Sequence, residues 1–141
     1  MSYQIPLFQL NFGEEEIQAV TDTIRSKWIS TGPKCEELEN LFVEMFRVNY
    51  AVSLSNCTDA LHLACMLCDL KLGDEVICPS LTFAASVNCI RYVGATPVFA
   101  DIVGPEHINI DPADIIKKIT SKTKAIVVVH MAGFPAQMDE I

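Results

Sequence analysis

The spacing of apolar residues along the chain switches repeatedly between the period of a helix and that of a strand. Ile17, Val20 and Ile24 recur three or four residues apart, behind three glutamates that suit the positive end of a helix dipole. Short apolar runs bounded by turn residues predict strands instead. Helices are expected over residues 14–24, 34–47, 60–70, 84–93 and 112–119, and strands over residues 50–54, 75–78, 96–100 and 125–129.

This alternation predicts an α/β fold with a mostly parallel sheet flanked by helices. Residues 125–129 form a continuous apolar run, which is typical of a central parallel strand covered on both faces. Residues 60–70 are apolar on nearly every side and are expected to lie buried against the sheet. Gly94 is placed to end one helix, and Asp111 followed by Pro112 is placed to begin the next.

The composition predicts one globular domain, residues 1–141, because half of the residues are hydrophobic and 20% are charged. A net charge of −8 argues against nucleic acid and against an anionic membrane surface as partners. The sequence has no apolar run near the roughly 18 residues that span a bilayer. Because residues 1–12 also lack the pattern of an export signal, we expect a cytoplasmic protein.

Six cysteines are expected to be reduced and to act as small hydrophobic side chains. Cys65 and Cys68 form one C-x-x-C pair inside an apolar helical pattern. The sequence has no second pair of Cys or His residues at the spacing of a zinc site. We therefore expect no metal.

The turn from Ser55 to Asp59 is the most informative stretch, because it precedes the helix expected at residues 60–70. It places backbone N–H groups and the hydroxyls of Ser55 and Thr58 at a helix N-terminus. Unpaired donors and the helix dipole there attract an anion such as phosphate. An ordinary N-cap favours the same residue types without any ligand, so the local sequence leaves both interpretations open.

Two aromatic residues stand at other breaks in the pattern. Phe83 follows the strand expected at residues 75–78, and open α/β sheets bind ligands beyond the carboxyl ends of their strands. Trp28, the single tryptophan, lies in a break that ends with Gly32 and Pro33. Pattern alone is equally consistent with a core position for each ring.

Four blocks resemble, in order and spacing, the DegT/DnrJ/EryC1/StrS family of sugar aminotransferases that depend on pyridoxal 5′-phosphate (PLP). The blocks are WISTGPK at 28–34, SNCTDALH at 55–62, DEVICPSLTF at 74–83 and VHMAGFPAQMD at 129–139. They extend across essentially the whole chain, and no one block would suffice. The resemblance implies the N-terminal part of the large domain of a fold-type-I aminotransferase, whose active site is shared across a homodimer.

The resemblance also implies roles for individual residues. In that family, the turn matching Asn56, Cys57 and Thr58 holds the cofactor phosphate, and the aromatic residue matching Phe83 stacks on the pyridine ring. Family members commonly have glycine where Cys57 stands; a positive φ would strain a cysteine there, whereas backbone donation tolerates it. The positions that match the sugar-nucleotide pocket are Trp28, Ser30, Thr31 and His130.

Two catalytic groups of the family have no match in this chain. The Schiff-base lysine and the acidic partner of the pyridine nitrogen belong to segments after residue 141, so no catalytic residue is assigned. The chain stops where a helix is expected to begin at Met138, which suggests a truncated product that is inactive alone.

The resemblance implies that the intact protein transfers an amino group, with glutamate as the expected donor, to a keto-sugar nucleotide. Such a reaction serves amino-sugar or polysaccharide biosynthesis. Two alternatives stay open: a sugar dehydratase of the same family, in which histidine replaces the lysine, and a non-catalytic remnant or interaction module.

Overall fold

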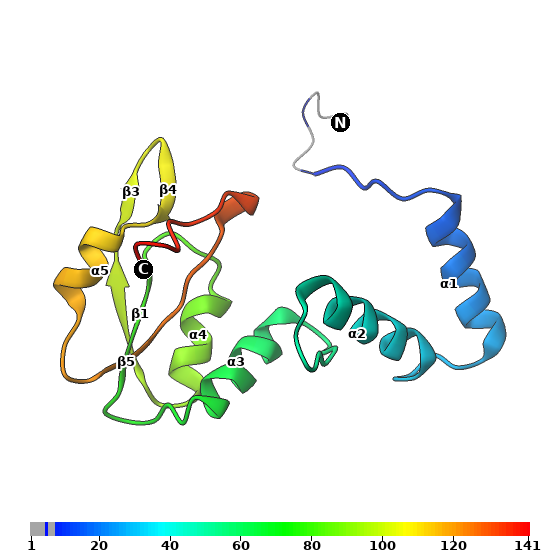
Figure 1. Ribbon diagram of the computed structural model, residues 1–141, viewed down its shortest axis with the longest axis horizontal. Coiled ribbons are helices and arrows are strands. Elements are labelled where there is room, and N and C mark those ends of the chain that lie inside the picture. Colours follow the sequence, from blue (N-terminus) through cyan, green and yellow to red (C-terminus); the bar gives the residue numbers. More distant parts are fainter. Residues whose placement is uncertain (1–4, 6–7) are drawn as a thin grey trace. The chain divides into compact units, whose positions relative to one another are not determined.

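The computed structural model describes residue 5 and residues 8–141, which form two units, one ending at Ser53 and one running from Leu54 to Ile141 (Figure 1). The first unit contains α1 (Glu14–Ser26) and α2 (Pro33–Phe46). The second contains α3 (Cys57–Leu67), β1 (Glu75–Pro79), α4 (Ala85–Tyr92), β2 (Thr96–Ala100), β3 (Ile102–Gly104), β4 (His107–Ile110), α5 (Pro112–Lys118), β5 (Thr123–Ile126) and the 3-10 helix η1 (Met131–Gly133).

The sheet of the second unit has three parallel strands in the order β2-β1-β5, with β1 in the centre. Ile77 of β1 lies opposite Val98 on one side and Ile126 on the other. The ladder continues past β5, because the Val127 N–H donates to the Ile77 carbonyl at 2.8 Å. The predicted parallel α/β fold is therefore confirmed.

Successive residues of β1 point to opposite faces of the sheet and join two separate cores. Val76 and Cys78 pack with Cys65 of α3 and Cys89 of α4. Ile77 packs on the other face in a cluster that includes Ile110, Ile115 and Ala100. Figure 1 shows the corresponding layers, with α3 and α4 on one side of the strands and α5 on the other.

The prediction of a strand at residues 50–54 is wrong. These residues have no strand partner in the described part of the chain, and a β-rich sequence forms a strand only when it can pair. Ser53 is held instead by α2: its backbone N–H and its hydroxyl donate to the Glu39 carboxylate at 2.7 and 2.8 Å.

The other differences concern short elements and burial. The hairpin of β3 and β4 was not predicted, because its strands have three and four residues and carry little periodicity. The helix expected from Met138 is a turn, closed by the Glu140 N–H donating to the Gln137 carbonyl.

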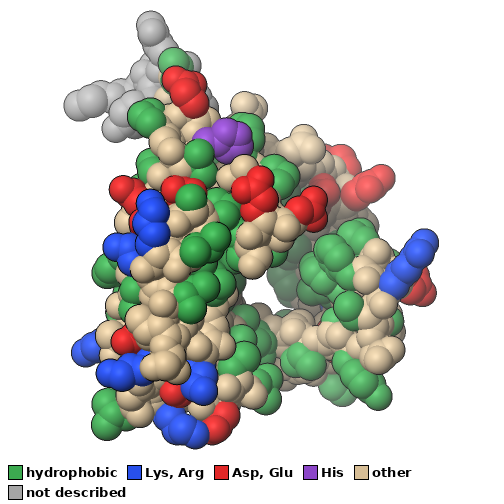
Figure 2. Space-filling model, turned by 60° about the vertical axis from the view of Figure 1, so that its left-hand side comes forward, with side chains coloured by type: hydrophobic (Ala, Val, Ile, Leu, Met, Phe, Trp, Pro, Cys, Tyr) green, Lys and Arg blue, Asp and Glu red, His purple; other side chains and the backbone are tan. Residues whose placement is uncertain are grey.

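The expected burial of residues 60–70 is mostly wrong, since Cys65 and Leu70 are buried whereas Leu67 is 88% exposed. Figure 2 shows further apolar side chains open on the visible surface among charged ones.

Replacing Ile77 by alanine tests the central role of β1. The side chain is completely buried, so the Ile77→Ala variant is expected to lose about 2–5 kcal/mol of unfolding free energy. Leu67→Ala on α3 is the matched control, because its side chain is exposed and its removal is expected to cost less than about 0.5 kcal/mol. Urea denaturation measures both, and equal losses would contradict the assigned core.

The contact between Glu39 and Ser53 predicts a pH effect. The backbone N–H and then the hydroxyl of Ser53 lower the pKa of Glu39 below its ordinary value of 4.5. A carboxyl group with a lowered pKa stabilises the fold above the unfolded-state pKa, and this contribution is lost as pH falls through the lower folded-state pKa. We expect Ser53→Ala to move the Glu39 midpoint in a carboxyl NMR titration upward, toward 4.5.

Ser121→Ala is the control for this titration, because Ser121 is exposed and lies in the other unit. It should leave the Glu39 midpoint unchanged. A wild-type midpoint at or above 4.5 would show that Ser53 does not donate to Glu39 in solution.

Candidate functional site

The turn that begins α3 is tied together by its own side chains. The N-cap Asn56 accepts from the Asp59 N–H at 2.9 Å and donates its amide to the Asp59 carboxylate at 2.8 Å. The Ser55 hydroxyl also donates to that carboxylate, at 2.7 Å. Asp59 therefore uses the side-chain donors of Ser55 and Asn56 and fixes the conformation of the turn.

Two backbone donors in the first turn of α3 stay free. The N–H groups of Cys57 and Thr58 have no acceptor among the described residues, and neither does the Thr58 hydroxyl. Cys57 does not have a positive φ, so the cysteine is not strained where family members commonly have glycine. Free N–H groups at the positive end of an 11-residue helix suit a phosphate group.

Phe83 lies between β1 and α4, beyond the carboxyl end of the central strand. Its side chain is 77% exposed, so the alternative of a core phenylalanine is wrong. The Phe83 carbonyl accepts from the Ser86 N–H at 3.0 Å, which fixes the backbone at the start of α4. The ring therefore offers an open apolar face at the edge of the sheet where α/β proteins bind ligands.

His130 lies after the extended segment that follows β5, at the start of η1. Its Nδ1 accepts from the Ala136 N–H at 3.0 Å, so the neutral ring carries its proton on Nε2. The side chain is exposed. The structure thus leaves the Nε2 N–H available as a donor.

Asn109 of β4 fixes the loop that carries His130, a role that was not predicted from the sequence. Its side chain is 3% exposed; the amide donates to the carbonyls of Phe134 and Pro135 at 2.9 Å, and its oxygen accepts from the Met131 N–H at 2.9 Å. A polar residue at a strand position facing a loop is the signal that was available, although many exposed strand residues share it.

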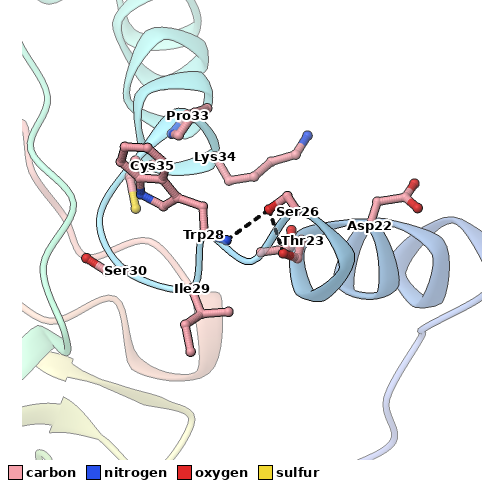
Figure 3. Close-up of a pocket in the computed structure, with 10 residues that line it drawn as sticks. Asp22, Thr23, Ser26, Trp28, Ile29, Ser30, Pro33, Lys34 and Cys35 are labelled. Atoms are coloured by element: carbon pink, nitrogen blue, oxygen red, sulfur yellow. Dashed lines mark hydrogen bonds between the residues drawn. The ribbon is translucent and has the colours of Figure 1, made fainter.

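Trp28, Ser30 and Thr31 belong to the other unit, in the connection between α1 and α2. Trp28 and Ser30 line a cavity of about 530 Å³ that is also lined by Ser26, Pro33 and Cys35, whereas Thr31 is not among its lining residues. Figure 3 shows the Trp28 indole turned toward the start of α2, and the hydrogen bond from the Trp28 N–H to the Ser26 hydroxyl. Trp28 is 58% exposed, so it does not plug a core.

Two buried thiols, those of Cys65 and Cys78, have a raised pKa, which disfavours the nucleophilic thiolate form. Burial raises the pKa of Cys65 to about 12 and that of Cys78 to about 11, with Cys89 adding to both shifts. The described residues contain no group of three His, Cys, Asp or Glu side chains that could hold a metal ion. Within the same residues, no helix is both long and apolar enough to cross a membrane.

The parallel sheet with helices on both faces is the fold of PLP aminotransferases in solved structures. The DegT/DnrJ/EryC1/StrS aminotransferase family matches residues 11–141, and the chain belongs to this family. The family predicted from the four sequence blocks is therefore confirmed.

Two curated relatives are similar over nearly the whole chain. GDP-perosamine synthase of Escherichia coli O157:H7 is 45% identical over 138 residues, which cover 97% of this chain and 38% of the relative. The spore coat polysaccharide biosynthesis protein SpsC of Bacillus subtilis is 43% identical over 141 residues, covering 100% of this chain and 35% of the relative. The chain thus spans little more than a third of the length of these proteins.

Solved structures agree with this assignment. Spr1654 of Streptococcus pneumoniae, a proposed sugar aminotransferase, superposes in its PMP form with a TM-score of 0.88 at 38% identity, covering 97% of this chain and 34% of that protein. The E. coli GDP-4-keto-6-deoxy-D-mannose-3-dehydratase, with bound hydrated PLP, gives a TM-score of 0.87 at 28% identity over 96% of this chain and 36% of that protein. The first of these structures holds PMP and the second holds hydrated PLP.

Removing the Asn109 amide tests whether it holds the His130 loop. Asn109→Ala loses three hydrogen bonds and leaves the Met131 N–H without its acceptor, so we expect about 1–3 kcal/mol lower stability and faster amide exchange at Met131. Asn88→Ala on α4 is the control, because Asn88 is exposed. Unchanged exchange at Met131 in Asn109→Ala would contradict the role.

Proposed function

We propose that these residues form part of a PLP-dependent sugar aminotransferase that moves an amino group from glutamate to a keto-sugar nucleotide. The observation that carries the proposal is the pair of free N–H groups at Cys57 and Thr58, in a chain of this family. A homodimer belongs to the same proposal and rests on the family resemblance. The cytoplasmic location stays the expectation drawn from the sequence.

The turn would hold the cofactor through its phosphate. The N–H groups of Cys57 and Thr58 and the Thr58 hydroxyl are the free donors at the start of α3, because the side chains of Ser55 and Asn56 already donate to Asp59. Those two bonds also offset the Asp59 charge, which would otherwise repel an anion beside the helix terminus. The residues present therefore fit a phosphate group.

The other residues would orient the cofactor ring and the sugar nucleotide. Phe83 offers an exposed apolar face against which an aromatic ring stacks. PLP, when bound, supplies the electron sink of the reaction. Trp28 and Ser30, which line the cavity, and the neighbouring Thr31 would bind the sugar nucleotide. The Nε2 N–H of His130 would donate to an oxygen of the substrate or cofactor.

A sugar dehydratase is the second candidate, favoured by the TM-score of 0.87 with the E. coli dehydratase. The turn and Phe83 serve both reactions in the same way, because each needs the same cofactor. The residue at the family's lysine position separates them: lysine supports the aminotransferase and histidine the dehydratase. Sequencing the coding region beyond codon 141 reads that position.

Replacing Cys57 by proline tests the backbone donor alone. Cys57 is the first residue of α3 and follows an extended Asn56 (φ −165°, ψ 163°), a place that tolerates proline while the N–H is lost. Because a hydrogen bond to a charged group contributes about 1.5–3 kcal/mol, pyridoxine 5′-phosphate should bind Cys57→Pro roughly 10–100-fold more weakly. This probe has no aldehyde and forms no bond to lysines.

Cys57→Ala is the matched control, since it keeps the N–H and should bind the probe like the wild-type chain. Pyridoxine without phosphate should bind all three proteins equally, and Thr58→Ala should weaken binding of the phosphorylated probe. Calorimetric titration measures each affinity. Equal binding of pyridoxine 5′-phosphate to Cys57→Pro and Cys57→Ala would contradict the assignment of the Cys57 N–H as a donor to the phosphate.

A further inference from the structure

Gly32 lies directly against the indole of Trp28. A Cβ atom at position 32 would stand 2.2 Å from Nε1, 2.7 Å from Cδ1 and 2.8 Å from Cε2 of that ring. These distances are far shorter than van der Waals contact. The ring occupies the space that any side chain at position 32 would need.

The backbone does not explain glycine at this position. Gly32 has a φ of 179°, which is extended and accessible to every residue. Gly94, by contrast, has a φ of +82° just after α4, where glycine relieves real strain. At position 32 the requirement is therefore space for the indole.

Two hydrogen bonds fix the tryptophan in this place. Its Nε1 donates to the Thr31 carbonyl at 2.9 Å, and its backbone N–H donates to the Ser26 hydroxyl at 3.1 Å. The clashing atoms belong to a rigid ring, so a side chain at position 32 would force the whole indole to swing away. The bond to Thr31 would then be lost, and the wall of the 530 Å³ cavity would change.

We propose that Gly32 is a positioning residue: its missing side chain lets the Trp28 indole lie flat on the chain and form one wall of the cavity between α1 and α2. The use of this wall for a sugar nucleotide rests on the function proposed above. The placement of the indole by Gly32 does not, so the two can fail separately.

Gly32 is also the N-cap of α2, and this allows a sharp choice of variants. Serine caps a helix better than glycine, and alanine caps it worse. If position 32 served the helix alone, Gly32→Ser would behave like the wild-type chain or better. If the indole needs the space, Gly32→Ser and Gly32→Ala should both displace it.

Trp28 is the single tryptophan, so its fluorescence and its one indole N–H signal in NMR report on this ring directly. Both variants are expected to shift the emission to longer wavelength, to increase quenching by acrylamide and to move the indole signal toward that of a free peptide. Gly104→Ala is the control, since nothing lies within 4 Å of a Cβ there. Far-UV circular dichroism checks that the helices persist.

A double-mutant cycle then tests the cavity with GDP-mannose as the probe. Gly32→Ser should weaken its binding in the wild-type background and have no further effect in Trp28→Ala, because glycine acts through the ring. An unshifted indole in Gly32→Ser overturns the proposal. If the indole is displaced in Gly32→Ser but the wild-type chain does not bind GDP-mannose, the role of Gly32 is supported. The same result counts against the sugar-nucleotide function.

Discussion

The second unit depends on a strand that is buried on both faces. In β1, Val76 and Cys78 pack toward α3 and α4, while Ile77 packs toward α5, and all three are fully buried. Parallel strands occur almost only in sheets whose two faces are both covered by helices, and β1 lies in such a sheet. The carboxyl end of the same strand leads to Phe83, so the core and the candidate site share one support.

Around that strand, the sequence was informative wherever an element carries a long periodic pattern. The helices α1, α2 and α4 and the strand β2 follow from spacing and end residues alone, and Gly94 ends α4 as expected. The strand expected at residues 50–54 failed for a physical reason. A strand is a pairing between segments, and the composition of one segment cannot show that its partner exists.

For the candidate site too, features set by neighbouring residues could be predicted, whereas features set by distant contacts could not. The helix N-terminus proposed to bind an anion could be located from the local sequence, because N-capping residues and a following apolar helix are contiguous in the sequence. The role of Asn109 could not, since its three hydrogen bonds reach 22 to 26 residues along the chain. Gly32 next to Pro33 was interpreted as a break in the pattern, whereas its contact with Trp28 becomes visible only in three dimensions.

The hydrogen bonds within the α3 turn have an entropic consequence. Ser55, Asn56 and Asp59 hold one another in place before any anion arrives, so the free N–H groups already point in fixed directions. Binding then requires little loss of conformational freedom, which is the general advantage of preorganisation. If the turn binds an anion as proposed, the Asp59 carboxylate has already ordered the donors that the anion would otherwise have to order.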